Sequence, residues 1–238
     1  MFLIDCTLPT MVENVALDEA LLLDAEQRSE PIEFLRIWEP QQLAVVMGRS
    51  GQVHKETLPD ACKHDHIPVI RRSSGGGTIL AGPGCLMYAL ILNHEIHPDS
   101  QEIQSCHDFV LNQMIQILKT LHLDCQILGT SDLVTENRKI SGNSLRRKQN
   151  ETLYHGTFLC HFDLPLMTQY LTVPDRIPEY RKTREHLEFV KNMNCEMGHL
   201  KQALIEHWTP RSEFHRIPQS ILNDLLETKY RDPHWHDG

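Results

Sequence analysis

The sequence predicts an α+β fold in which mixed, mainly antiparallel sheets are flanked by helices. Short β-rich runs cluster along the chain without the strict alternation of strand and helix that marks a doubly wound parallel sheet. Two longer segments, 11–28 and 102–122, carry apolar residues at helical spacing. The chain has 238 residues, 40% hydrophobic and 23% charged, which suits one large globular domain with at most a small appendage.

A capping box marks the beginning of the first predicted helix. Thr10 and Glu13 have the required spacing, and apolar residues follow at helical intervals to about residue 28. The β-rich runs 34–38 and 43–47 lie close together in the chain, and we interpret them as a strand pair. Further strands are predicted at 69–72, 78–80 and 86–92.

The second half opens with the amphipathic helix 102–122. A second β region follows, in which Glu136 and Asn137 form a tight turn between two strands. The tail from Arg231 is expected to fray. The remaining predicted strands are 125–128, 132–135, 139–141 and 153–162, and the remaining predicted helices are 164–171, 197–208 and 220–229.

Composition excludes several classes of protein. No apolar run approaches the roughly 20 residues that cross a bilayer, and the N-terminus lacks the basic region of a signal peptide. We therefore expect a cytoplasmic protein that does not bind membranes. The net charge of −9 argues against nucleic-acid binding. Basic residues at 138–148 and 181–184 suggest one anionic ligand or one acidic partner surface; for the second cluster, a solvated face is the alternative.

Cysteine and histidine patterns indicate no metal centre or disulfide framework. Seven cysteines occur without a Cys-x-x-Cys pair, and most lie in apolar runs, as reduced thiols of a cytosolic protein do. Fifteen histidines include no pair at helical His-x-x-x-His spacing with a carboxylate between them. Whether the protein binds a metal is left open by these patterns.

The most informative segment runs from Arg71 to Thr78. Two arginines follow a short apolar run and precede three glycines, so that a strand ends in positive charge and then loses its side chains. Glycine backbone lets N–H groups approach an anion closely, and guanidinium groups bind phosphate or carboxylate. We interpret the segment as an anion-binding loop, with a flexible turn as the alternative. Its candidate residues are Arg71, Arg72, Ser74, Gly75, Gly76, Gly77 and Thr78.

Two later segments carry the other candidate residues. In residues 129–144, Lys139 follows the predicted turn and precedes small residues. In residues 153–159, a histidine, a glycine and a threonine lie in an alternating strand pattern. The candidates from these segments are Asp132, Lys139, Ser141, Gly142, Asn143, His155, Gly156 and Thr157.

Together the three segments resemble the set found in the lipoate–protein ligase and lipoyl/octanoyl-transferase family. Their order and spacing carry the resemblance, which extends from the first helix to Arg184. It implies the fold of the biotin/lipoate ligase catalytic domain, which is similar to class II synthetases. On this basis we expect a catalytic domain over 1–210, with 211–238 forming a short helix and tail and no accessory domain.

The resemblance implies a two-step reaction. Lipoate and ATP, with Mg²⁺, would give lipoyl-AMP, or the enzyme would accept lipoyl-AMP made elsewhere. The lipoyl group would then pass to a specific lysine of a lipoyl carrier domain, in a 2-oxoacid dehydrogenase or a protein like the glycine cleavage H protein. Because larger ligases carry a C-terminal accessory domain, a separate accessory subunit is a further expected partner.

Roles for individual residues also follow from the resemblance. The family lysine that matches Lys139 contacts the carboxyl and phosphate oxygens of the acyl group, where a fixed cation stabilises charge on the carbonyl oxygen. Asp132 matches the acid that faces the adenylate or the incoming amine. We assign His155 to the wall of the acyl pocket. The other candidates are expected to bind the lipoyl group or the adenylate; for Lys139 and Asp132, exposed strand and turn residues are the alternatives.

Other functions remain open. The chain has Ala81 and Gly82 where family ligases commonly have His-Asp, so it lacks this polar pair for holding nucleotide and metal. A cysteine-dependent acyltransferase that takes its acyl group from a carrier would use Cys85 or Cys125. A degenerate family member would only bind a lipoylated partner or nucleotide. A biotin ligase is disfavoured because its Gly-Arg-Gly-Arg-x-Gly loop is absent.

Overall fold

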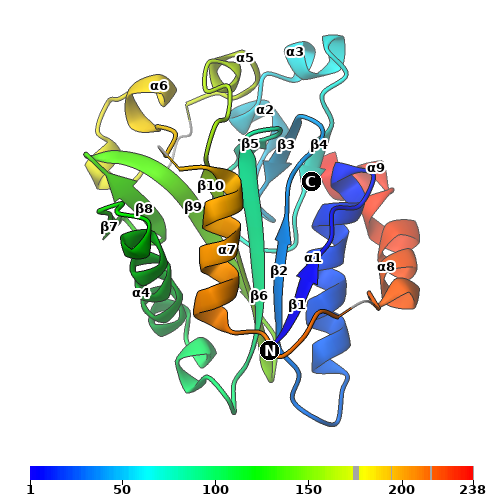
Figure 1. Ribbon diagram of the computed structural model, residues 1–238. Helices are drawn as coiled ribbons and strands as arrows, with labels where there is room; N and C mark the ends of the chain where they lie inside the picture. Colours follow the sequence, from blue (N-terminus) through cyan, green and yellow to red (C-terminus); the bar gives the residue numbers. More distant parts are fainter. Residues whose placement is uncertain (174–176, 194, 215, 238) are drawn as a thin grey trace.

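The computed structural model describes residues 1–173, 177–193, 195–214 and 216–237. Within these ranges the chain forms a seven-stranded sheet, in the order β1-β2-β6-β10-β9-β8-β7, and a three-stranded sheet, β4-β3-β5 (Figure 1). Only the pairs β1–β2 and β3–β4 are parallel, so the predicted mixed, mainly antiparallel α+β fold is confirmed. The strands are β1 (Phe2–Asp5), β2 (Phe34–Trp38), β3 (Ala44–Met47), β4 (Val69–Arg71), β5 (Ile79–Ala81), β6 (Cys85–Asn93), β7 (Gln126–Leu128), β8 (Asp132–Thr135), β9 (Arg138–Arg147) and β10 (Glu151–Leu159).

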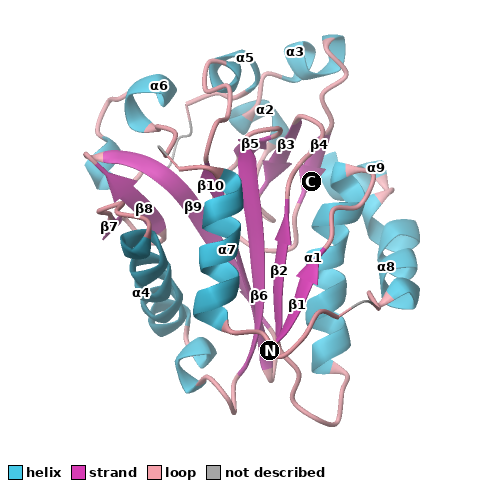
Figure 2. Ribbon diagram, in the orientation of Figure 1, coloured by secondary structure: helices cyan, strands magenta, loops and turns pink. Residues whose placement is uncertain are grey.

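Helices cover both faces of the large sheet (Figure 2). One core lies between this sheet, α1, α8 and the small sheet, and a second lies between the large sheet, α4 and α7. None of the described helices has both the length and the apolar character to cross a membrane. The helices are α1 (Met11–Glu26), α2 (Val53–Glu56), α3 (Pro59–His64), η1 (Pro98–Gln101), α4 (Ile103–Thr120), α5 (Leu166–Tyr170), η2 (Glu179–Arg181), α6 (His186–Phe189), α7 (Met197–Trp208), α8 (Gln219–Leu225), the π-helix η3 (Leu226–Tyr230) and α9 (Pro233–Asp237).

Strand β6 joins the two cores. All nine of its residues are buried, which explains why its sequence is a continuous apolar run and not an alternating one. Successive side chains nevertheless point to opposite faces. The first core receives Met87, Ala89 and Ile91, and the second receives Leu86, Tyr88, Leu90 and Leu92.

Two short-range predictions are confirmed in detail. Thr10 Oγ1 accepts from the backbone N–H of Glu13 at 3.2 Å, and the Glu13 carboxylate accepts from the Thr10 N–H at 2.9 Å, so the capping box begins α1. Glu136 and Asn137 have φ values of 48° and 59° between β8 and β9. Positive φ at both central residues is the geometry of a type I′ hairpin turn.

The predicted pairing of segments 34–38 and 43–47 is wrong. Strand β2 pairs with β1 and β6 in the large sheet, whereas β3 pairs with β4 and β5 in the small one. Both strands are buried along their whole length, and each lies between two other strands of its sheet. The chain therefore crosses between sheets where a hairpin was expected.

The tail from Arg231 does not fray, contrary to expectation. It forms α9, and its backbone carbonyls at Trp235 and His236 accept hydrogen bonds from the Arg71 guanidinium at 2.7 and 2.9 Å. In return, Trp235 Nε1 donates to the Arg71 carbonyl at 2.9 Å. The C-terminal segment is thus attached to the strand that leads into the glycine loop.

A buried carboxylate attaches the same segment to α1. Glu19 is 3% exposed and accepts from Lys229 Nζ at 2.7 Å and from the Tyr230 hydroxyl at 2.6 Å. Arg146 on β9 also donates to it. Burial alone would raise the pKa of Glu19, but the hydrogen bonds from Lys229 and Tyr230, with the charge of Arg146, lower it. Residues far apart in the sequence are therefore joined at one charged cluster.

Glu151, at the start of β10, should give the fold a measurable pH dependence. Its side chain is buried, Oε2 has no partner among the described residues, and burial raises its pKa to about 7 despite a hydrogen bond from Asn93. The folded protein therefore keeps a proton that the unfolded chain releases at about pH 4.3. Consequently, the free energy of unfolding should fall as the pH rises from about 5 to about 8.

Urea unfolding of a Glu151→Gln variant tests this dependence. The variant has no carboxyl group to ionise at this position, so its unfolding free energy should lack this part of the fall, about 3 kcal/mol at most. Unfolding is measured for both proteins at several pH values across that window. Parallel pH profiles for wild type and variant would contradict the prediction.

Candidate functional site

Two connected cavities lie between the large and small sheets. The outer chamber has a volume of about 400 Å³ and the inner chamber about 150 Å³. Because eight residues line both, the two chambers form one continuous site. The shared residues are Gly77, Thr78, Ile79, Ser131, Asp132, Lys139, Gly142 and Thr157.

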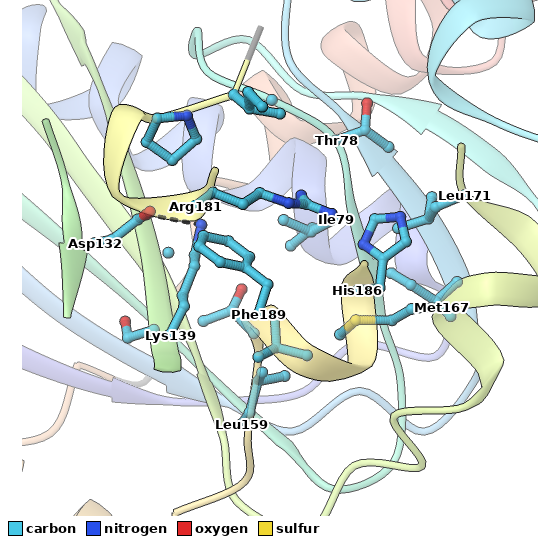
Figure 3. A pocket seen from close by; sticks show the side chains of 18 of the residues that line it. Thr78, Ile79, Asp132, Lys139, Leu159, Met167, Leu171, Arg181, His186 and Phe189 are labelled. Carbon is cyan, nitrogen blue, oxygen red and sulfur yellow. Dashed lines mark ion pairs between the residues drawn. The ribbon is translucent and has the colours of Figure 1, made fainter. Parts of the chain in front are cut away.

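The two chambers differ in their walls. The inner chamber is lined by α1, β2, β3 and β6 through mainly apolar side chains, among them Val15, Trp38, Val46 and Met87. The outer chamber is bounded by α5 and by residues 177–190, which supply apolar, aromatic and charged groups (Figure 3). A narrow inner space thus opens into a wider outer space, and the walls of both combine apolar with polar groups.

A β-bulge directs Lys139 into the site. Strands β8 and β9 pair regularly as far as Leu133 and Ser141. The next pair joins Val134 to Lys139, so that Ile140 is an extra residue on β9. An extra residue changes which face the following side chain occupies. Because of this bulge, Lys139 faces the same chambers as Gly142, which lies three positions further along the strand.

Lys139 forms an ion pair at the junction of the chambers. Its Nζ lies 2.7 Å from Asp132 Oδ1, and the Tyr180 hydroxyl donates to Asp132 Oδ2 at 2.7 Å. Figure 3 shows this pair on one wall of the cavity, below the Arg181 side chain. The Lys139 side chain is 25% exposed, and the ammonium can therefore meet a ligand.

Gly142 provides the space that the Lys139 ammonium occupies. A Cβ on Gly142 would lie 2.8 Å from both Cε and Nζ of Lys139. Because these atoms end a flexible side chain, a Gly142→Ala variant should fold with nearly wild-type stability while its ammonium is displaced. We expect turnover to fall about tenfold or more, since misplaced catalytic groups lose much of their effect. Steady-state kinetics and thermal unfolding measured together check this; equal losses in both, or in neither, would contradict it.

Arg72 holds the glycine loop in shape. Its Nε donates to Ser74 Oγ at 3.0 Å, Nη1 to the Val46 carbonyl at 3.1 Å, and Nη2 to the carbonyls of Gly75 and Gly77. Burial lowers the pKa of Arg72 to about 10, which leaves it a cation at neutral pH. Its hydrogen bonds go to the loop and to β3, and not outward to a ligand.

The loop presents its backbone to the site. The N–H groups of residues 75–77 donate to no acceptor in the described part of the chain, and a Cβ on Gly77 would meet nothing within 4 Å. The loop packs against a second glycine corner, where a Cβ on Gly48 would lie 1.9 Å from the Gly76 carbonyl oxygen. Free N–H groups on an exposed glycine turn are suited to bind an anion.

A chain of hydrogen bonds ties the loop to α1. His155 Nε2 lies 2.6 Å from Ser74 Oγ, and its Nδ1 lies 3.0 Å from Asp18 Oδ2. Asp18 Oδ1 accepts from the fully buried Arg36 at 2.6 Å. We assign the imidazole proton to Nδ1, because the Asp18 carboxylate can only accept. Ser74 then donates to His155 and accepts from Arg72.

Twelve of the fifteen candidate site residues line the chambers, and three do not. Arg71 lies off the chamber walls, and its guanidinium donates to carbonyls of the 48–51 corner and of α9. Ser74 and Gly75 also lie off the chamber walls and accept bonds that shape the loop. The twelve that line a chamber are Arg72, Gly76, Gly77, Thr78, Asp132, Lys139, Ser141, Gly142, Asn143, His155, Gly156 and Thr157.

Several residues of the site were missed in the sequence. Trp38 and Tyr88 line the inner chamber from strands that the apolar pattern showed only as core. Asp18 and Arg36 carried a usable signal, since each is a charged residue inside an otherwise apolar helix face or strand. Two opposite charges in such positions predict a buried ion pair, although not its location.

The cysteines lie outside the site. All seven belong to the described residues, and none lines either chamber. Burial raises the pKa of Cys85 to about 12 and that of Cys125 to about 11. A thiol acts as a nucleophile in its thiolate form. Neither residue has the surroundings of a nucleophile.

Comparison with known proteins gives one family. Residues 10–209 match the family model described as the lipoyl protein ligase A/B catalytic domain. The chain is 31% identical over 207 residues to a putative lipoate-protein ligase A of Schizosaccharomyces pombe, covering 77% of this chain and 55% of that protein. It is 24% identical over 246 residues to lipoate-protein ligase A subunit 1 of Thermoplasma acidophilum, covering 94% and 91%. The chain spans about half the length of several curated relatives, 45% of one and 55% of another.

Solved structures share the fold. A bipartite lipoate protein ligase from Thermoplasma acidophilum, studied with its E2 lipoyl domain, superimposes with a TM-score of 0.84 at 22% identity, over 100% of this chain and 96% of that one. A lipoate-protein ligase A bound with ATP gives the same TM-score and identity, over 100% and 98%. At such identities the likeness concerns the arrangement of helices and strands.

Proposed function

Because the chain belongs to the lipoyl protein ligase A/B catalytic domain family, we propose that it attaches lipoyl groups to lysines of acceptor proteins. One observation carries the proposal. The Lys139 ammonium stands where the narrow inner chamber, with Val15, Trp38, Val46 and Met87 in its wall, meets the wider outer chamber, and Gly77 lines the same junction. An acyl-adenylate has its carbonyl and phosphate between an apolar chain and a nucleotide, so its charged centre would lie at this junction.

The walls suggest how the substrates divide between the chambers. The inner chamber would take the hydrocarbon chain of lipoate, since burial of apolar surface favours it there. The outer chamber would take the nucleotide. The free N–H groups of Gly76 and Gly77, which line the chambers, would donate to its α-phosphate. ATP binding by a structural neighbour supports the nucleotide assignment, and a neighbour with bound lipoic acid supports the acid.

In the first step, a carboxylate oxygen of lipoate attacks the α-phosphorus of ATP. The bond from that phosphorus to the bridging oxygen breaks, and pyrophosphate leaves with the electron pair. Lys139 lies where negative charge gathers on the carboxylate and phosphate oxygens, so its cation stabilises the transition state. The loop, the inner chamber and residues 177–190 exclude water from the reactive lipoyl-AMP.

The outer chamber also offers donors for Mg²⁺ brought in with ATP. The carboxylates of Glu56 and Asp132 and the hydroxyl of Thr78 line it. Among the described residues no group of three or more His, Cys, Asp or Glu could hold a metal. Mg²⁺ bound through nucleotide phosphates needs only one or two carboxylates, so this donor set fits the ion. The ion would neutralise phosphate charge during the first step.

In the second step, the amine of an acceptor lysine attacks the lipoyl carbonyl carbon. The bond from that carbon to the phosphate oxygen breaks, AMP leaves with the electron pair, and the amine loses a proton as the amide forms. Lys139 would stabilise the oxyanion of the intermediate, and Asp132 would face the incoming amine. The acceptor would be the lipoyl domain of a 2-oxoacid dehydrogenase, which a bipartite neighbour studied with its E2 lipoyl domain supports, or a glycine cleavage H-like protein.

Activation and transfer need not reside in one chain. The Thermoplasma relative that matches nearly the whole length of this chain is named as subunit 1 of a ligase. We therefore include a separate accessory chain in the proposal. Without it, the protein would transfer preformed lipoyl-AMP, and with it, the protein would also use ATP.

Mass spectrometry of an apo lipoyl domain tests the proposal. Incubation with the protein, lipoate, ATP and Mg²⁺ should add one lipoyl group to one lysine. Preformed lipoyl-AMP, supplied in place of lipoate and ATP, should give the same product. Alternative acids in the same assay report acyl-chain preference. No modification from either donor would contradict the proposal. It would also favour a degenerate family member that only binds nucleotide or a lipoylated partner.

A cysteine-dependent acyltransferase is the second candidate, because the matched family model includes the B-type proteins. The positions of Cys85 and Cys125 outside both chambers weigh against it. ATP-independent transfer from an acyl carrier protein that is lost in a Cys85→Ala or Cys125→Ala variant would favour this function instead.

A further inference from the structure

Arg181, at the end of η2, places a buried cation in the outer chamber. Its side chain lines that chamber and is 4% exposed. Nε donates to the Arg184 carbonyl at 3.0 Å, and the guanidinium carbon lies 4.6 Å from the centre of the Phe189 ring. In Figure 3 the side chain crosses the cavity above Phe189, toward Ile79. One edge of the guanidinium is thereby fixed to residues 177–190, the segment that bounds the outer chamber.

The other edge lacks a partner. Nη2 is buried, and no group in the described parts of the chain accepts a hydrogen bond from it. Burial lowers the pKa of Arg181, which the charge of Glu185 only partly opposes. A buried donor that carries charge and has no acceptor destabilises a fold, so its retention inside a cavity indicates an anionic ligand.

The other cations near the site are already engaged. Lys139 is paired with Asp132 at 2.7 Å. Arg72 donates to the glycine loop, and Arg138 donates to two carbonyls of the segment 187–190. Among the described residues that line the outer chamber, Arg181 is therefore the Lys or Arg side chain without an ion-pair partner, and it is available to a ligand's second charged group.

The position of Arg181 indicates which charged group of the ligand it binds. The residues at the junction, including Lys139 and Gly77, line both chambers, whereas Arg181 lines only the outer one. If the reacting α-phosphate lies at the junction, the cation lies beyond it. We propose that Arg181 binds the β- and γ-phosphates of ATP and then the departing pyrophosphate. This inference rests on the proposed function and adds a binding residue specific to its first step.

The proposed role of Arg181 affects the reaction with ATP but not the transfer from lipoyl-AMP. When the carboxylate attacks and the bond from the α-phosphorus to the bridging oxygen breaks, the electron pair and the charge move onto pyrophosphate. A guanidinium binds two phosphate oxygens at once. Lipoyl-AMP has no β- or γ-phosphate, so transfer from it to the acceptor lysine gains nothing from Arg181.

The test compares the two donors in purified variants of this chain. Arg181→Gln should lower kcat/KM for ATP about 10- to 100-fold, the effect of losing hydrogen bonds to a charged group. It should leave transfer from lipoyl-AMP within about threefold of wild type, because the segment that covers the chamber is also held by Arg138 and Arg184. Arg181→Lys should fall between. Lys182→Gln is the matched control, since it removes a neighbouring exposed charge that lies outside the chamber.

Calorimetric titration with Mg-pyrophosphate gives a readout without turnover. Weaker binding in Arg181→Gln, with unchanged binding in Lys182→Gln, is the expected result. Equal losses with ATP and lipoyl-AMP, or no loss with either, would overturn the assignment, as would unchanged pyrophosphate binding. A wild-type protein that transfers from neither donor would instead contradict the proposed function, so the two failures differ.

Discussion

Replacement of Lys139 by alanine is expected to lower the rate of lipoyl transfer about 100- to 1,000-fold. This is the usual loss when one fixed group that stabilises an oxyanion is removed. Both steps should suffer, because charge develops at the same junction in each. Single-turnover measurements with ATP and with lipoyl-AMP therefore should show losses of similar size. A Lys139→Arg variant should recover little, because a planar guanidinium does not replace a compact ammonium.

The fold should tolerate the Lys139→Ala change. The side chain makes one ion pair, and Asp132 keeps its hydrogen bond from Tyr180. Lys191→Ala is the matched control, since Lys191 also forms a 2.7 Å ion pair, with Glu136, but does not line either chamber. We expect that control to keep wild-type activity. Activity retained in Lys139→Ala would refute its assigned role, and so would an equal loss in the control.

A Gly48→Ala substitution should disable the site through the backbone. The new Cβ would lie 1.9 Å from the carbonyl oxygen of Gly76 and 2.9 Å from its carbonyl carbon. Neither atom belongs to a flexible side chain, so the glycine loop must move. We expect the unfolding free energy to fall by about 1–3 kcal/mol, as in other cases of overpacking. Turnover should fall about 100-fold, because the loop's N–H groups leave their positions.

Activity and thermal unfolding of the same preparations check this second prediction. Gly198→Ala, on α7, is the control, because a Cβ there meets nothing within 4 Å. It should preserve activity, and the two variants can be compared directly, since both changes add one methyl group. If Gly48→Ala retained the activity and unfolding temperature of the control, the close contact between the two glycine corners would not matter in solution.

Features set by neighbouring residues could be predicted from the sequence. The capping box of Thr10 and Glu13 and the turn at Glu136 and Asn137 depend on contacts within three residues, and both are found in the structure. Long amphipathic helices and strands were also predicted well, because their hydrophobic faces repeat. The continuous apolar run of β6 signalled a strand that is buried on both faces.

Features set by distant contacts could not be predicted. Arg71 and Arg72 look alike in the sequence, yet one binds the carbonyls of α9 and the other holds the glycine loop. Which of two adjacent arginines meets a ligand depends on the carbonyls that surround each after folding. Likewise, the pairing of β2 and β3 was set by the two sheets they complete and not by the short link between them.

The attachment of Arg71 to α9 has a consequence for the order in which the molecule is made. The guanidinium partners at Trp235 and His236 lie 164 and 165 positions later in the chain. During synthesis all ten described strands of the two sheets emerge from the ribosome before those carbonyls do. The loop at residues 75–77 thus acquires this support late, and we expect a nascent chain to gain a fully supported loop only after residues 235 and 236 have left the ribosome.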